Sequence, residues 1–128
     1  MENLTLENLE KLSEEKLRDA DVLYGAGCYG GAFYICGYAV ELSLKEKICI
    51  TLGWDEYPSD GKYKFLKIHD FEVLLHFSGA EKQVKKTLMS EWSIVMKWNP
   101  DTRYSSAIQT AKNALLMIKS TEEIWLHL

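Results

Sequence analysis

Five polar residues in this sequence carry side chains suited to binding or transforming a phosphate-bearing ligand: Glu41, Lys45, His69, Arg103 and Tyr104. Lys45 follows Glu41 by four positions, so on a helix the two side chains lie one turn apart and can form an ion pair. A carboxylate beside an apolar stripe needs such a partner, because an unpaired buried charge is costly. Arg103 is the second candidate partner for Glu41.

The alternative to a structural ion pair is a polar pocket formed by Glu41, Lys45, Arg103 and Tyr104 that binds a phosphate-bearing ligand. A guanidinium group suits this role because its fixed fork of N–H donors matches phosphate oxygens. If Arg103 pairs with Glu41, less of its charge is left for the phosphate.

His69 precedes Asp70 and a short apolar run, and we expect it to cap the helix that starts there, alongside Asp70. An imidazole can also act as acid or base near neutral pH, and catalytic use would need a second polar group within reach. The other histidines, His76 and His127, show no ligand-like spacing with His69, so the sequence predicts no metal site. It contains no glycine-rich nucleotide-binding motif and predicts no cofactor.

The stretch from Gly30 to Leu52 is predicted to be the central helix of the fold. Its apolar residues recur at steps of three and four, the spacing of one helix face: Phe33, Gly37, Val40, Leu44 and Ile48. Small residues thicken this stripe and would let a neighbouring helix approach closely. Glu41 interrupts the apolar run too early for a membrane span, which needs roughly 18–20 uncharged apolar residues.

A first helix is predicted from about Leu6 to Tyr24, with Thr5 as its N-cap. The glycines between positions 25 and 31 indicate a turn into the central helix, and Gly53 indicates its end. A connection of about fifteen residues follows. It interleaves lysines with Tyr63 and Phe65, a weak nucleic-acid signal; the alternative is an ordinary loop that packs these rings on the bundle. No strand pattern is found.

The second half of the chain is predicted to hold three more helices: a short one over residues 70–77, one from about Ala80 to Met96, and one from near Ser105 that continues past Ser120. The inward face of the helix over 80–96 is Val84, Leu88, Trp92 and Val95. The stripe of the last helix is Ile108, Ala111, Leu115, Ile118 and Trp125. Trp92, Trp98 and Trp125 are predicted to cluster between these two helices.

Length and composition predict one globular domain over residues 1–128. The fold class is all-α, an up-and-down antiparallel bundle of four long helices plus one short helix. The net charge of -4 argues against a sequence-independent grip on nucleic acid. Three cysteines without paired spacing are expected to be reduced, and no secretory signal is evident, so we expect a cytoplasmic protein.

Three segments together resemble the HEPN (higher eukaryotes and prokaryotes nucleotide-binding) domain family: GYAVELSLKEKI, HDFEVLL and TRYSSAIQTAKNALLMI. The matching positions are Gly37-Tyr38-Ala39, Glu41, Leu44-Lys45, His69-Asp70-Phe71 and Arg103-Tyr104. The resemblance covers about residues 10–120. It implies the same helical bundle, usually as a homodimer, and a ribonuclease, a partner of a minimal nucleotidyltransferase, or a module without activity.

Ribonucleases of this family share Arg-x(4–6)-His near the last long helix, and this chain departs from that pattern. At those offsets Arg103 is followed by Ile108, Gln109 and Thr110, and Arg18 by Leu23, Tyr24 and Gly25. The resemblance therefore implies a non-catalytic module that binds nucleotide, RNA or protein, in a toxin–antitoxin or defence setting. One alternative is a divergent metal-independent ribonuclease that uses His69 and Arg103. Another is a structural dimerisation module that partners a nucleotidyltransferase.

Overall fold

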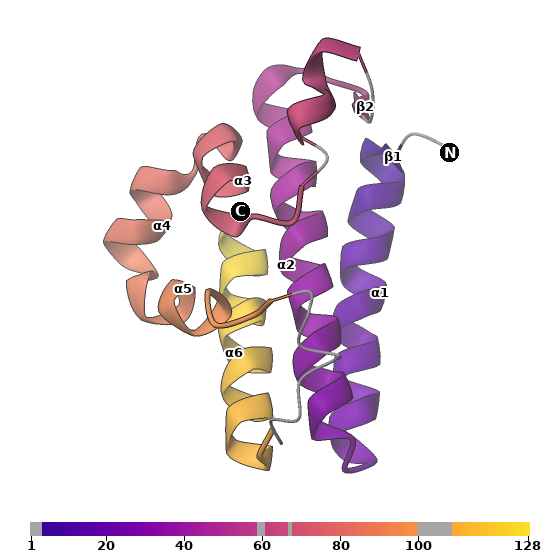
Figure 1. The fold of residues 1–128 in the computed structure, drawn as a ribbon, viewed down its shortest axis with the longest axis vertical. Helices are drawn as coiled ribbons and strands as arrows, with labels where there is room; N and C mark the ends of the chain where they lie inside the picture. The colour runs from indigo at the N-terminus through magenta and orange to yellow at the C-terminus, as the bar shows by residue number, and fades with distance from the viewer. Residues whose placement is uncertain (1–3, 59–60, 67, 100–108) are drawn as a thin grey trace.

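A computed structural model describes residues 4–58, 61–66, 68–99 and 109–128 (Figure 1). The helices are α1 (Leu6–Gly25), α2 (Tyr29–Leu52), the 3-10 helix η1 (Gly61–Leu66), α3 (Phe71–Ser78), α4 (Glu81–Thr87), α5 (Met89–Val95) and α6 (Ala111–His127). The strands are β1 (Leu4–Thr5) and β2 (Glu56–Tyr57). The predicted all-α class is confirmed, because this sheet of two short strands is small beside the helices.

The start of α1 follows from local chemistry, as predicted. Thr5 is its N-cap, and the side-chain oxygen accepts a hydrogen bond from the backbone N–H of Asn8 at 3.1 Å. The same segment also forms an antiparallel strand pair, with Leu4 opposite Tyr57 and Thr5 opposite Glu56. No strand pattern is found in the sequence, and so this strand pair was not predicted. Two-residue strands are too short to show an alternating pattern in the sequence.

The bounds of α2 confirm the predicted end and correct the predicted start. Gly53 is the C-cap, with a φ of 69° that favours glycine. Helix α2 begins at Tyr29, so Gly30 and Gly31 lie in its first turn and not in the turn between helices. That turn is shorter than predicted and contains Gly27, whose φ is 79°.

The predicted helix over residues 80–96 is instead two helices of seven residues, α4 and α5, separated at Leu88. Leu88 has φ -128° and ψ 29°, which is outside the helical region. The predicted inward face is nevertheless correct, since Val84, Leu88, Trp92 and Val95 are all buried. A bend between two helices preserves this face, because each half still turns its own apolar residues toward α3 and α6.

Helix α6 begins at Ala111, with Thr110 as an extended N-cap, so the predicted start near Ser105 is wrong. The helix continues without a break through Ser120, as predicted. Its predicted stripe is partly wrong: Leu115 is 40% exposed, and Ile108 lies outside the described residues. The buried residues of α6 are Ala114, Met117, Ile118, Ser120, Thr121 and Ile124.

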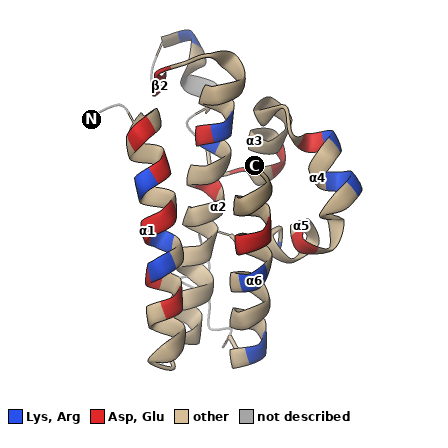
Figure 2. Cartoon of the chain, turned by 180° about the vertical axis from the view of Figure 1, so that it is seen from behind, with Lys and Arg blue, Asp and Glu red and all other residues tan. Residues whose placement is uncertain are grey.

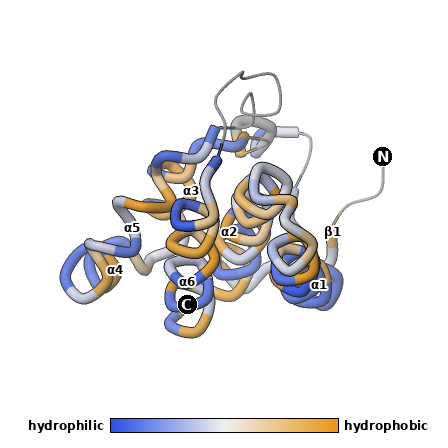
Figure 3. Tube along the Cα trace, turned by 90° about the horizontal axis from the view of Figure 1, so that it is seen from below, coloured by the Kyte–Doolittle hydropathy of each residue, from blue (hydrophilic) through white to orange (hydrophobic). Residues whose placement is uncertain are grey.

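Helix α2 packs against α1, α3 and α6, and α1 also contacts α6 (Figures 1 and 3). Helix α1 runs antiparallel to α2, and the colours in Figure 1 show that α6 runs in the same direction as α2. This placement confirms α2 as the central helix. It buries both apolar and polar residues of α2, including Leu44, Ile48, Glu41 and Lys45.

Acidic and basic residues are interspersed along α1, whereas α4 has one acidic residue, Glu81, followed by Lys82, Lys85 and Lys86 (Figure 2). Within the described ranges, no helix has the length and apolar character needed to span a bilayer.

Candidate functional site

The candidate site is built on a buried ion pair in the middle of α2. Glu41 is 5% exposed and Lys45 is 7% exposed. The Nζ atom of Lys45 lies 3.1 Å from Oε2 of Glu41, one helical turn away. The predicted pairing of these residues is therefore confirmed. Because both groups have left water, each depends on the other to offset its desolvation.

The second partner of Glu41 is His69, from the segment that leads into α3. The Nδ1 atom of His69 lies 2.5 Å from Oε1 of Glu41. Asp70 alone is the N-cap of α3, accepting from the backbone N–H groups of Glu72 and Val73 at 3.0 and 3.3 Å. The predicted capping role of His69 is therefore wrong. The contact joins residues 28 positions apart, and local sequence chemistry carries no signal of it.

This contact determines which ring nitrogen of His69 carries a proton. An ionised carboxylate only accepts hydrogen bonds, so Nδ1 of His69 carries the proton that it donates to Glu41. The neutral ring then has Nε2 as its acceptor, directed by a carboxylate that is itself held by Lys45. The His69 side chain is 55% exposed, so this nitrogen belongs to a ring within reach of solvent and ligands.

Tyr57 completes the surroundings of Lys45. The Lys45 ammonium lies 5.1 Å from the centre of the Tyr57 ring. The Tyr57 hydroxyl donates a hydrogen bond to the backbone carbonyl of Leu66. Burial raises the pKa of Tyr57 well above its ordinary value, and the Cys49 and Glu41 charges add to this effect. Tyr57 therefore stays protonated and links β2 to the end of η1, near the segment that carries His69.

His69 borders a groove of about 390 Å³. The residues that line it are His69, Asp70, Phe71, Met96, Trp98 and Asn99. Phe71 and Trp98 are stacked, with ring centres 5.2 Å apart and planes 5° apart. The groove thus combines an oriented imidazole with aromatic and thioether surface. This chemistry suits a ligand that has both a flat ring and a polar or anionic group.

The three tryptophans do not form one cluster, which corrects the prediction. Phe71 lies between Trp92 and Trp98, at ring-centre distances of 6.4 and 5.2 Å. Trp125 faces α1 instead, where its Nε1 donates to Ser13 Oγ at 3.1 Å. Trp125 therefore belongs to the contact between α6 and α1.

Arg103 and Tyr104 lie outside the described residues. Their part in the predicted four-residue pocket therefore stays a prediction. Of the predicted site residues, the structure brings together Glu41, Lys45 and His69. The sequence reasoning missed Tyr57, whose position depends on the β1–β2 pairing. No local signal marks Tyr57 as a neighbour of Lys45.

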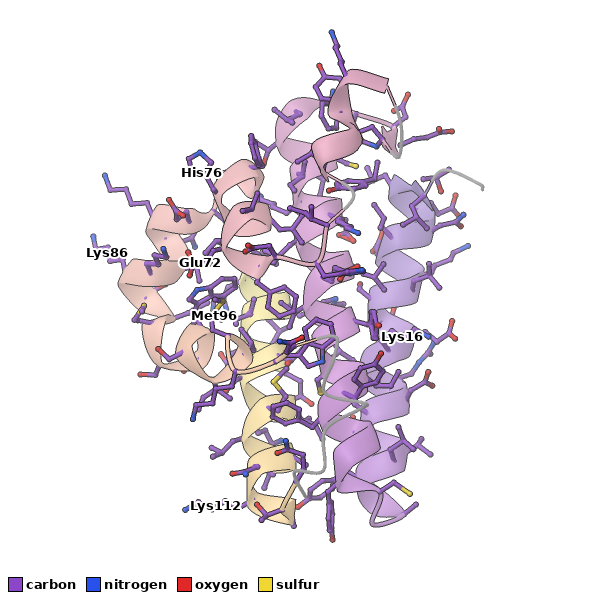
Figure 4. The ribbon with its side chains drawn as sticks, in the orientation of Figure 1. Lys16, Glu72, His76, Lys86, Met96 and Lys112 are labelled. Carbon is purple, nitrogen blue, oxygen red and sulfur yellow. The ribbon has the colours of Figure 1, made fainter. Side chains whose placement is uncertain are left out.

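A second polar cluster, centred on Glu72 of α3, was also missed. Glu72 lies between α3 and α4 (Figure 4). Its carboxylate accepts hydrogen bonds from Lys85 Nζ at 2.9 Å and from Trp92 Nε1 at 2.8 Å. These bonds, with the Lys85 bond the stronger influence, lower the pKa of Glu72. Lys85 is on α4 and Trp92 on α5, so this carboxylate ties both halves of the bent segment to α3.

The three cysteines are free thiols, with Cys28 exposed and Cys36 and Cys49 buried. Burial raises the pKa of Cys36 to about 12 and that of Cys49 to about 11, so both buried thiols stay protonated. Within the part of the chain that the structure describes, no group of three His, Cys, Asp or Glu side chains is placed to hold a metal ion.

Comparison of the chain with protein-family models, with curated proteins and with solved structures found no match in any of the three.

Proposed function

We propose that the protein is a HEPN-like helical module that binds a phosphate-bearing ligand, a nucleotide or RNA, in the groove beside His69. The single observation that carries the proposal is the contact between His69 Nδ1 and Glu41 Oε1 at 2.5 Å. A buried glutamate that already has a lysine partner holds a solvent-reachable imidazole at the edge of a groove. The carboxylate orients the ring through Nδ1, and in the imidazolium form Nε2–H is a second donor that can bind a phosphate oxygen.

The groove fits the two parts of a nucleotide. Phe71, Trp98 and Met96 supply surface against which a flat base can pack, and His69 supplies the polar contact. Asp70 also lines the groove, but two backbone N–H groups at the start of α3 offset the charge of its carboxylate. In this proposal Arg103 and Tyr104 contribute further phosphate contacts. Helices α1, α2 and α6 would be three of the four long helices of a homodimeric bundle.

The calorimetric titration of the intact protein with adenosine monophosphate and with a short RNA tests the proposal. His69→Gln should weaken binding by about tenfold, the cost of a lost charge-assisted hydrogen bond. His76→Gln is the matched control, because His76 is also on the surface and lies on α3, away from Glu41. Arg103→Ala should weaken binding as well.

If the His69 and His76 variants bind the ligand with equal affinity, His69 is not part of the binding site. A folded intact protein that binds neither ligand would refute the proposal and favour the third interpretation, an interaction module that partners a nucleotidyltransferase.

A divergent ribonuclease is the second candidate, and the same His69–Glu41 contact favours it. A carboxylate that fixes the histidine tautomer is what general acid–base catalysis requires. Metal-independent RNA cleavage that disappears in both His69→Gln and Arg103→Ala would support this candidate. Cleavage retained in either variant would contradict it.

A further inference from the structure

A second recess lies at the end of the molecule that carries β2 and η1 (Figure 1). Its volume is about 490 Å³, and it is lined by Gly53, Trp54, Asp55, Glu56, Pro58 and Tyr63. It shares no lining residue with the His69 groove. Its walls combine two aromatic rings with two carboxylates, whereas the His69 groove combines an imidazole with aromatic and thioether surface.

The two rings form differently oriented walls of this recess. The ring centres of Trp54 and Tyr63 are 4.8 Å apart, and the ring planes are inclined by 57°. Aromatic faces attract cations through their quadrupole, most strongly for tryptophan. The Tyr63 ring already has one cation near it, since Lys62 Nζ lies 5.2 Å from its centre.

The carboxylates of Asp55 and Glu56 give the recess its charge preference. Both residues are exposed, and they follow Trp54 directly in the chain. Their negative charge favours a cation in the recess and opposes an anion such as phosphate. The two carboxylates outnumber the single Lys62 ammonium beside Tyr63, so the Trp54 face and these carboxylates are complementary to an organic cation.

Backbone hydrogen bonds hold the acidic and aromatic residues in place. The N–H of Trp54 donates to the carbonyl of Cys49 at 2.8 Å, and the N–H of Leu6 donates to the carbonyl of Asp55 at 2.9 Å. Glu56 is paired with Thr5 in the β1–β2 ladder. These bonds position the recess before any ligand arrives, which lowers the entropic cost of binding.

We propose that this recess binds the arginine side chain of a partner polypeptide. A guanidinium group is flat and delocalised, so it can stack on an aromatic face while its N–H groups donate to a carboxylate. A lysine ammonium is a compact charge that cannot make both contacts equally well. The site is independent of the proposed phosphate site, and the failure of one leaves the other untouched.

The test is a two-dimensional NMR titration of the full chain with a blocked Gly-Gly-Arg-Gly-Gly peptide. The matched peptide carries citrulline, which has nearly the shape of arginine without its charge. We expect the arginine peptide to shift the Trp54 indole N–H and the backbone amides of Asp55 and Glu56. The citrulline peptide should bind at least about tenfold more weakly, and a lysine peptide should lie between the two.

Variants locate the contact. Trp54→Leu and Asp55→Asn should each weaken binding of the arginine peptide several-fold. Asp55→Asn keeps the backbone carbonyl that accepts the hydrogen bond from Leu6. This variant therefore tests the contribution of the Asp55 charge to binding without disturbing that fold contact. Tyr29→Leu is the matched control, because Tyr24 and Tyr29 form a similar tilted pair, 5.4 Å apart at 58°, that does not line the recess.

Equal binding of the citrulline peptide, or equal losses in the Asp55 and Tyr29 variants, would overturn the proposal. Free arginine amide that binds as tightly as the peptide would show that the ligand is a small guanidinium compound, and would overturn the polypeptide part.

Discussion

The indole ring of Trp98 lies directly against Gly37 of α2, in the space that any other residue's Cβ would fill. A Cβ added to Gly37 would lie 1.9 Å from Cε2 of Trp98 and 2.0 Å from its Nε1. The indole cannot withdraw easily, because its Nε1 donates to the carbonyl of Tyr34 at 2.9 Å and its ring is stacked on Phe71. Glycine is required at position 37 because the Trp98 ring lies so close to the helix backbone. The backbone conformation of Gly37 is helical and would itself accept other residues.

Gly37→Ala should therefore lower the free energy of unfolding by about 1–3 kcal/mol, the cost of overpacking a core. Helix propensity alone predicts the opposite sign, a gain of roughly 0.5–1 kcal/mol. Gly30→Ala is the matched control in the same helix, because no atom lies within 4 Å of a Cβ at that position. Urea denaturation of both variants decides the question; an unchanged or raised stability of Gly37→Ala would mean that Trp98 moves aside without cost.

The buried Glu41–Lys45 pair should show strong coupling. Glu41→Leu leaves the Lys45 ammonium buried without its carboxylate and should cost about 3–5 kcal/mol. Lys45→Met should cost less, because Glu41 retains His69 as a partner. Adding Lys45→Met to Glu41→Leu should recover stability, since it removes the orphaned charge. A double-mutant cycle from urea unfolding measures this coupling, and strictly additive effects would be evidence against a desolvated pair.

The free energy of unfolding should depend on pH through the Glu72 carboxyl. Bonds from Lys85 and then Trp92 lower the pKa of this carboxyl in the folded protein. A lowered folded pKa contributes stability above the unfolded pKa, and this contribution is lost as the pH falls through the folded value. The advantage of the natural chain over Glu72→Gln should therefore be present at neutral pH and vanish in acid.

The Glu72 effect should be small, because solvent screens a side chain that is 42% exposed. Glutamine keeps an oxygen that can accept from Trp92, so this substitution isolates the charge. Glu14→Gln, at an exposed position of α1, is the control and should show no such trend. A stability difference for Glu72→Gln that stays constant from neutral to acid pH would contradict the interpretation.

Thiol reactivity should separate the three cysteines. Burial raises the pKa of Cys36 to about 12 and that of Cys49 to about 11, and it also blocks access to both. Cys28 is exposed. Because the thiolate is the reactive form, Ellman's reagent should modify one thiol in the folded protein and all three in denaturant. Rapid modification of a second thiol under native conditions would show that α2 opens locally.

Much of the fold could be predicted because its boundaries are set by local chemistry. Thr5 and Asp70 cap helices with their own side chains, and Gly53 and Gly79 end helices at positive φ. The break at Leu88 could not be predicted, because the apolar pattern passes through it in phase. Tertiary contacts span the break, because Glu72 of α3 accepts hydrogen bonds from Lys85 on one side of it and from Trp92 on the other.

The candidate site was predictable only where its contacts are local. Glu41 and Lys45 are four positions apart, so helical geometry alone pairs them. The contact of Glu41 with His69 depends on how the segment before α3 returns to α2, and no spacing rule encodes that return. For the same reason Trp125 was wrongly assigned to the group of Trp92 and Trp98, since its partner Ser13 lies at the other end of the chain.

In the proposed site, Glu41 holds His69 through a proton on Nδ1, and Nε2 is the atom that takes up a proton and donates to the phosphate of the ligand. A long-range proton–nitrogen NMR spectrum of the imidazole rings tests this proposal most directly, recorded without and with adenosine monophosphate. We predict that neutral His69 carries its proton on Nδ1 and that the ligand shifts its Nε2 resonance, while His76 is unaffected. A neutral His69 that carries its proton on Nε2 in the free protein, or an Nε2 resonance that does not change when the ligand is added, would contradict this proposal.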